Sequence, residues 1–152
     1  MSQGIMAALT HLEGRILDVT PKTDVHHGFV ALARAGGMTP SLTERSNSTR
    51  YFMMEIEAFP EDDGAAGLSG RRRVSVSLRV RYDIPQDQLF LQRMIAEDAE
   101  SLLVKLKGPE YSFATTGIVS VIPEAPLVEP VNVDNDEAVI LSIPFTLLYL
   151  EA

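Results

Sequence analysis

The stretch from Arg71 to Lys107 constrains the fold more than any other part of this chain. Between Val74 and Tyr82 it alternates strictly between apolar and polar residues, and a period of two is the pattern of a strand with one buried face. After Pro85 the apolar residues recur every three or four positions, as on one stripe of a helix: Leu91, Ile95, Ala99, Leu102 and Leu106. The sequence therefore predicts a strand that leads into a helix lying across its apolar face, with Glu97 and Glu100 on the outer side.

A second alternating stretch, from Arg50 to Phe59, precedes the first. A glycine-rich segment at about 60–71 separates the two stretches, which favours an antiparallel hairpin with a long loop. We expect even-numbered residues to oppose even-numbered ones, because a slip by one residue would turn Arg79 and Arg81 into the core. The shared apolar face then consists of Phe52, Met54, Ile56 and Ala58 with Val74, Val76, Leu78 and Val80.

The remaining segments predict one further helix and shorter strands. Residues 2–18 carry an apolar stripe typical of a helix, whereas residues 20–49 predict a long loop with one short strand at about 29–33. A short strand is expected at 117–122, followed by an edge strand or extended arm containing Pro123, Pro126 and Pro130. The last strand, at 138–150, is apolar on both faces, and Pro144 within it lacks an N–H, so one of its edges should be bulged or unpaired there.

These elements predict a single α+β domain spanning residues 1–152, with a mainly antiparallel sheet of about four or five strands and two helices packed on one face. Apolar residues make up 45% of the chain, which suffices for a core. The segments Asp24–Asn47 and Asp62–Gly70 lack apolar periodicity. We expect both to be mobile in the isolated subunit and to become ordered on contact with a partner.

Composition argues against several classes of function. The net charge of -8 would repel nucleic acid and anionic membranes. The chain has no Cys, which removes disulfides, thiolate metal sites and cysteine nucleophiles. No apolar run approaches the roughly 20 residues of a membrane span, and no signal peptide is expected at the N-terminus.

Three local patterns could carry chemistry, but each has a simpler interpretation. His26 and His27 are adjacent in a loop, so their side chains diverge and do not predict a metal site. Glu55 and Glu57 could serve acid–base chemistry, but pairing with Arg79 and Arg81 across the hairpin is the favoured interpretation. The glycine-rich segment lies between two strands, unlike a phosphate-binding loop, which opens a helix. We therefore expect no catalytic residue, no metal site and no cofactor.

The charges are distributed unevenly along the chain. Five of its ten arginines are Arg71, Arg72, Arg73, Arg79 and Arg81. No basic residue follows Lys107, whereas seven acidic residues do: Glu110, Glu124, Glu129, Asp134, Asp136, Glu137 and Glu151. Two interpretations remain open. The pattern arises by chance with pairing inside one molecule, or it marks a head-to-tail contact between the basic hairpin of one copy and the acidic part of the next.

The order of elements resembles the tail terminator proteins of long-tailed phages, the lambda-type family. The similarity comprises the N-terminal helix, the long loop, the hairpin strand ending at Tyr82, the turn at 83–85 into a helix, and the terminal strand from Ile143 to Glu151. The resemblance implies a non-enzymatic virion protein in the tail–neck region, assembled in the cytoplasm of the bacterial host. It would form a ring, by this resemblance a hexamer, that caps the tail tube and faces the head connector. Neck and head–tail joining proteins share the fold and remain alternatives.

The resemblance, joined to the charge pattern, implies where subunits would meet. The partners implied are other copies of the chain, the tail tube protein and a head connector or stopper protein, without a membrane or a specific nucleic acid. The candidate interface residues are Arg71, Arg72, Arg73, Arg79, Arg81, Glu124, Glu129, Asp134, Asp136 and Glu137, with Leu148 and Leu150 as apolar contacts. Two other classes remain open: a monomeric binding domain and a small hydrolase.

Overall fold

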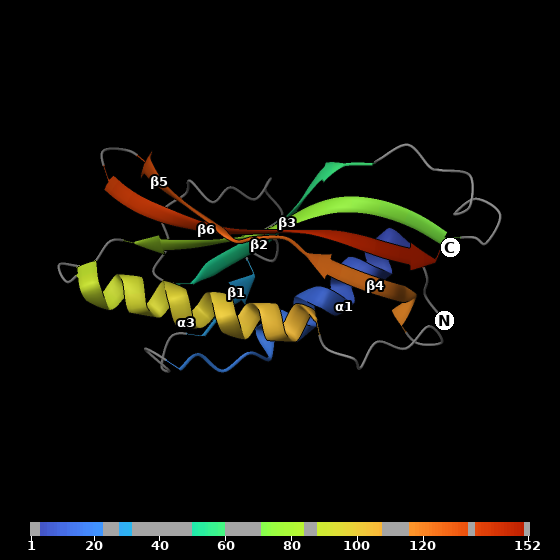
Figure 1. The fold of residues 1–152 in the computed structure, drawn as a ribbon, viewed down its shortest axis with the longest axis horizontal. Coiled ribbons are helices and arrows are strands. Elements are labelled where there is room, and N and C mark those ends of the chain that lie inside the picture. Colours follow the sequence, from blue (N-terminus) through green and yellow to red (C-terminus); the bar gives the residue numbers. More distant parts are fainter. Residues whose placement is uncertain are drawn as a thin grey trace.

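The computed structural model describes residues 4–22, 28–31, 50–59, 71–83, 88–107, 116–133 and 136–150. These form an α+β fold of two helices and a six-strand, mostly antiparallel curled sheet (Figure 1). The elements are α1 (Ile5–Leu17), β1 (Val30–Ala31), β2 (Tyr51–Ala58), β3 (Arg71–Asp83), α3 (Gln88–Leu106), β4 (Ile118–Pro123), β5 (Leu127–Val133) and β6 (Asp136–Leu150). Among the described residues, no helix is both long and apolar enough to cross a membrane.

The paired strands β3 and β6 form the spine of the sheet. They run antiparallel in unbroken register, from Arg71 opposite Leu150 at one end to Asp83 opposite Ala138 at the other. On its other side β6 pairs with β4 along its C-terminal part and with β5 along its N-terminal part. β2 pairs with β3, and β1 lies outside β2 in parallel orientation. The two lateral edges of the sheet are therefore β1 with β2 on one side, and β4 with β5 on the other.

The predicted register of the β2–β3 hairpin is confirmed over most of its length. Phe52 lies opposite Val80, and Met54 lies opposite Leu78. A bulge between Ile56 and Ala58 then shifts the pairing, so that Ala58 lies opposite Ser75. The prediction that even-numbered residues oppose even-numbered ones is therefore wrong at Ala58. A bulge adds one residue to a strand and bends it, which is common near the end of a hairpin.

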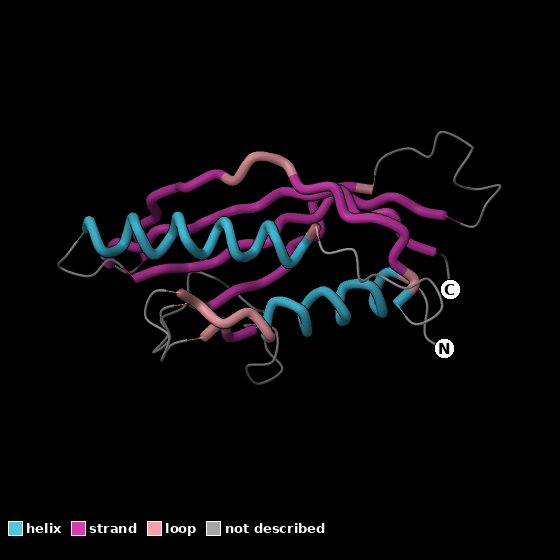
Figure 2. Tube along the Cα trace, turned by 60° about the horizontal axis from the view of Figure 1, so that its bottom comes forward, coloured by secondary structure: helices cyan, strands magenta, loops and turns pink. Residues whose placement is uncertain are grey.

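Both helices pack on the face of the sheet that carries the apolar side chains of β3 (Figure 2). On α3 the predicted stripe is buried at Leu91, Ile95, Leu102 and Leu106, while Ala99 is half-buried. Glu100 is exposed as predicted, but Glu97 is half-buried. Two residues that were not predicted, Met94 and Asp98, also lie on the buried side of the helix. The main core thus forms one continuous cluster of residues from both helices and the sheet, and Ile140 with Tyr51 and Met53 forms a second, small cluster.

Long-range hydrogen bonds fix the ends of these elements. The guanidinium of Arg15 on α1 donates from Nε and Nη2 to the carbonyl oxygen of Lys105, at 3.3 and 2.8 Å. It thereby satisfies one of the carbonyls that the end of a helix leaves without a partner. The N–H of Gly4 donates to Leu150 at 3.0 Å, and the N–H of Leu150 donates to Gly117 at 2.8 Å. Gly4 and Gly117 have φ angles of 98° and 70°, a region that favours glycine.

Pro144 occupies the place in β6 where its lack of an N–H costs nothing. Its carbonyl accepts a hydrogen bond from the N–H of Glu124 at 2.7 Å, so this edge of Pro144 faces the link between β4 and β5. In an antiparallel ladder the N and O atoms of one residue point to the same side. The missing donor therefore faces the gap in which β4 has ended and β5 has not begun, which confirms the predicted unpaired edge.

The sheet has one strand more than the four or five predicted. The proline-containing segment, interpreted from the sequence as an edge strand or an arm, includes the regular strand β5, which pairs with β6 over seven residues. The short strand expected at 29–33 is present as Val30–Ala31. Apart from residues 28–31, the two predicted mobile segments lie outside the described residues, as do His26 and His27.

Candidate functional site

The register of the spine separates only part of the two candidate charged groups. Arg71 and Arg73 lie opposite Leu150 and Leu148 at one end. The hairpin of β5 and β6 lies at the other end, beyond Ala138. Twelve residue steps along β3 separate the two ends, a span of about 40 Å at the usual rise per residue. Arg81, in contrast, lies in one cross-strand row with Glu129, because both pair with Ile140. Only the arginines at the start of β3 are therefore distant from the acidic candidates, and the candidate residues do not form one site.

The arginines of β3 differ strongly in exposure. Arg72 and Arg73 are exposed. Arg79 is partly exposed and donates from Nη1 to Oε2 of Glu55 at 2.9 Å, which confirms one predicted ion pair across the hairpin. Arg81 lies on the side away from the helices, as its parity predicts, but it is only 3% exposed. It stands between Tyr51 and Ile140 in the cross-strand row. It is therefore not available to a neighbouring molecule in this conformation.

The acidic candidates are less completely described. Glu124, in the link between β4 and β5, and Glu129, in β5, are both exposed. Asp136 and Glu137 begin β6, opposite Val133 and Asn132, and Asp134 lies outside the described residues. Leu148 and Leu150, the predicted apolar contacts, are half-buried. The structure thus brings these leucines next to the arginines at one end and keeps them apart from the acidic residues.

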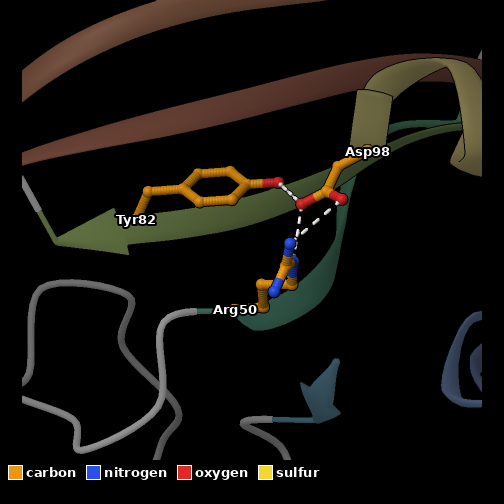
Figure 3. Close-up of polar contacts among 3 residues, drawn as sticks. All are labelled: Arg50, Tyr82 and Asp98. Carbon is orange, nitrogen blue, oxygen red and sulfur yellow. Dashed lines mark hydrogen bonds and ion pairs between the residues drawn. The ribbon is translucent and has the colours of Figure 1, made fainter. Parts of the chain in front are cut away.

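A buried ionic cluster that sequence reasoning missed joins three elements of the fold (Figure 3). Arg50, directly before β2, donates from Nε to Oδ2 of Asp98 on α3 at 2.6 Å, and from Nη2 to Oδ1 at 3.3 Å. The hydroxyl of Tyr82 on β3 donates to the same Oδ2 at 2.8 Å. All three residues are 0% exposed. The cluster ties the middle of α3 to the start of β2 and the end of β3.

Aromatic residues cover the arginine from the side of β1. The guanidinium carbon of Arg50 lies 5.8 Å from the centre of the Phe29 ring, within the range of a cation–π contact. Phe29 in turn meets Phe52 edge to face, with 6.4 Å between ring centres. The N–H of Val30 donates to the carbonyl of Arg50 at 3.0 Å. β1 is thus attached to the same cluster, which holds the two described ends of the segment from residue 32 to 49 together.

The electrostatics of the cluster suit a structural role. Burial raises the pKa of the Asp98 carboxyl, and the hydrogen bonds from Arg50 and Tyr82 act against that rise. Burial also raises the pKa of Tyr82, and the neighbouring negative charge of Asp98 raises it further, so the phenol keeps its proton and remains a donor. Because the three side chains are shielded from solvent, a substrate in water cannot reach them.

A signal for this cluster was present in the sequence. Arg50 and Tyr82 have the parity of the core-facing residues Phe52 and Val80. Asp98 lies three residues after Ile95 and four before Leu102, so it falls on the apolar stripe of the helix. A basic and an acidic residue at core positions of neighbouring elements predict a buried pair, because a charge in a core needs a partner.

The other patterns from the sequence do not converge on a site. Glu55 is held by Arg79, and the bulge after Ile56 interrupts the regular alternation that would put Glu57 on the same face. Among the described residues, no group of three or more His, Asp and Glu residues could hold a metal ion.

Comparisons with known proteins return no family for this chain. The candidate interaction surfaces are the exposed charged residues of β3 and β5 and the two lateral edges of the sheet. A role must therefore be argued from those surfaces. Neither a scan against protein-family models nor a search of curated proteins found a match.

Proposed function

We propose that this chain is a structural virion protein, a tail terminator that forms a ring capping the phage tail tube and joining it to the head connector. The observation that carries the proposal is the separation of charge on one elongated sheet. Exposed Arg72 and Arg73 lie at one end, and exposed Glu124 and Glu129 lie along β5 and the link before it. The α+β fold and the hairpin that leads into α3 agree with the resemblance to this family.

Opposite charges on different surfaces of one molecule favour contacts between copies in a head-to-tail arrangement. Such a heterologous interface closes into a ring when its rotation allows, and otherwise it extends into a filament. A closed ring leaves no unused partner surface, so growth stops with it. This is the property that a cap on a polymerised tube requires, and the number of six subunits comes from the resemblance alone.

The charges alone do not provide a stable ring. Each exposed ion pair contributes about 0 to 1 kcal/mol, and salt weakens it. We therefore expect the charges to set the alignment of the subunits and the rate of their association. Apolar contacts must supply most of the affinity, so the ring should weaken in high salt without dissociating completely.

Reversing the basic end is expected to impair assembly. The double variant Arg72→Glu with Arg73→Glu replaces attraction to Glu124 and Glu129 by repulsion, so size-exclusion chromatography with light scattering should show mostly monomer where the unaltered chain forms a ring. A matched control is Arg93→Glu with Lys107→Glu, which makes the same change of charge at two exposed positions, one on α3 and one directly after it, and should leave assembly intact. Adding Glu124→Lys and Glu129→Lys to the first variant should restore part of the assembly.

One result would remove the ring from consideration. If the unaltered chain remains monomeric at high concentration and low salt, and also in the presence of tail tubes, the terminator proposal fails. The chain would then be better described as a monomeric binding domain.

A further inference from the structure

Exposed apolar side chains gather on the lateral edge formed by β4 and β5. Ile122 is 60% exposed, Leu127 53% and Val128 54%. Neighbouring residues of a strand point to opposite faces, so β5 has an exposed apolar side chain on each face. Within the described residues β5 pairs with β6 alone. We call Ile122, Leu127 and Val128, together with exposed Glu124 and Glu129, the β5 patch.

The backbone of this edge is protected against pairing with a further strand. The carbonyl of Pro144 points toward the β4–β5 side of β6. The backbone groups of alternate residues in a strand point in the same direction, so the N–H and carbonyl of Ile140 also point toward β5. Glu129 is paired with Ile140, so its backbone N–H and carbonyl point toward β6. The backbone groups of the next residue, Pro130, point away from the sheet. Because Pro130 has no N–H, the outer edge lacks a donor at its middle. A partner would consequently bind the β5 patch through side chains rather than by extending the sheet.

The opposite lateral edge carries a second group of exposed apolar residues. β1 pairs only with Tyr51 and Phe52, and farther along β2 Ile56 is 40% exposed and Phe59, directly after the strand, is 62% exposed. Ala58 lies opposite Ser75, so the continued register brings Phe59 opposite Val74, which is next to Arg73 in β3. We call Ile56 and Phe59, together with exposed Arg72 and Arg73, the β2 patch.

We propose that the β5 patch of one copy docks onto the β2 patch of the next, so that a second copy of this chain is its partner. Each patch combines exposed apolar side chains with charges, and the charges are acidic on the β5 patch and basic on the β2 patch. Glu57 adds one exposed acidic residue near the β2 patch, while Glu55 is held by Arg79. Among the described residues of this edge, two exposed arginines thus stand beside one exposed acidic residue that Arg79 does not hold.

This inference rests on the proposed ring and specifies its interface. The two patches lie on opposite edges in the strand order of the sheet, so their contact is head to tail and can close on itself. It also moves the main apolar contact away from the half-buried Leu148 and Leu150. Leu127 and Val128 take their place, because each still has more than half of its surface to bury.

The first test replaces the apolar side chains of the β5 patch. Leu127→Ser with Val128→Ser should raise the protein concentration at which rings form by at least about tenfold, as measured by light scattering. The control Leu89→Ser with Val104→Ser changes two α3 side chains that are 63% and 67% exposed, and rings should form as in the unaltered chain. Thermal melting should be nearly unchanged in both variants, because all four side chains are exposed.

The second test uses the absence of cysteine from the chain. Phe59→Cys and Val128→Cys are made as separate single variants and treated with a short thiol-reactive cross-linker. Covalent dimers should form when the two variants are mixed and not with either variant alone. Dimers of Val128→Cys alone would show a symmetric contact between β5 patches and would overturn the head-to-tail docking.

The outcomes separate this inference from the proposed function. If the unaltered chain forms rings and Leu127→Ser with Val128→Ser forms them equally well, the docking is wrong and the ring stands. The docking is also wrong if that variant forms rings but no longer caps tail tubes, because the β5 patch then binds the tube. If the unaltered chain forms no ring under any condition, both proposals fail.

Discussion

Replacing Asp98 with Ala is expected to lower the free energy of unfolding by about 3 to 5 kcal/mol, the usual cost of removing one partner from a buried ion pair. Asp98 and Arg50 are both 0% exposed. The variant would leave the guanidinium buried without its carboxylate, and the hydroxyl of Tyr82 without its acceptor. Equilibrium unfolding in urea, compared at equal slope with the unaltered chain, measures the loss.

Two companion variants separate the contributions within the cluster. Tyr82→Phe removes one hydrogen bond to the carboxylate and should cost about 1.5 to 3 kcal/mol, the range for a bond to a charged group. Arg50→Met with Asp98→Leu removes both charges together and should be more stable than Asp98→Ala, because no unpaired charge remains. Glu100→Ala, on the exposed side of the same helix, serves as the control and should unfold like the unaltered chain.

A small effect of Asp98→Ala would contradict the geometry of the cluster. If the variant unfolds at the same urea concentration as Glu100→Ala, Arg50 must reach solvent or another acceptor in solution. The contact between α3 and the start of β2 would then not depend on this ion pair.

Elements with a regular alternation of buried apolar and outward polar residues were predictable from the sequence. The alternation in β2 and β3 is regular, and it correctly placed Phe52 opposite Val80 and Leu78 in the core. The same reasoning failed at Ala58, because one inserted residue reverses the parity and nothing in the alternation marks the bulge. The sequence does not decide between a strand and an arm for β5, because Pro126 and Pro130 weaken the signal. Only its position beside β6 shows that the outward side of Pro130 needs no donor.

The exposure of a charged residue could not be read from its parity. Arg79 and Arg81 share one face of β3, yet Arg79 is partly exposed and Arg81 is buried. Parity tells which face a side chain occupies, but not whether that face is covered. The apolar residues on both sides of β6 were a partial signal. On the face away from the helices, Ala138 and Ile140 are buried, whereas Leu148 and Leu150 are half-buried.

The candidate interface was predictable as a separation of charge but not as a set of contacts. Chain order alone put the arginines and the acidic residues in different segments. The register of β3, β6 and β5 separates Arg72 and Arg73 from Glu129 but brings Arg81 into the same cross-strand row as Glu129. The exposed apolar residues Leu127 and Val128 could not be singled out, because a short apolar pair between prolines is equally compatible with burial. Their exposure follows from the position of β5 at an edge.

Replacing Leu102 with Ala is expected to lower the free energy of unfolding by about 2 to 5 kcal/mol, the range for removing a large side chain from a packed core. Leu102 is 0% exposed and belongs to the cluster that joins both helices to the sheet. Deleting its terminal atoms leaves a cavity that helix and sheet can close only in part.

Val104, two residues after Leu102 on the same helix, provides a control. It is 67% exposed, so Val104→Ala removes little buried surface, and Ala favours the helix more than Val does. Its free energy of unfolding should stay within about 0.5 kcal/mol of the unaltered chain. If Leu102→Ala melted like Val104→Ala, the stripe of α3 that faces the sheet would be assigned wrongly. The packing of α3 against the sheet would then need a different register.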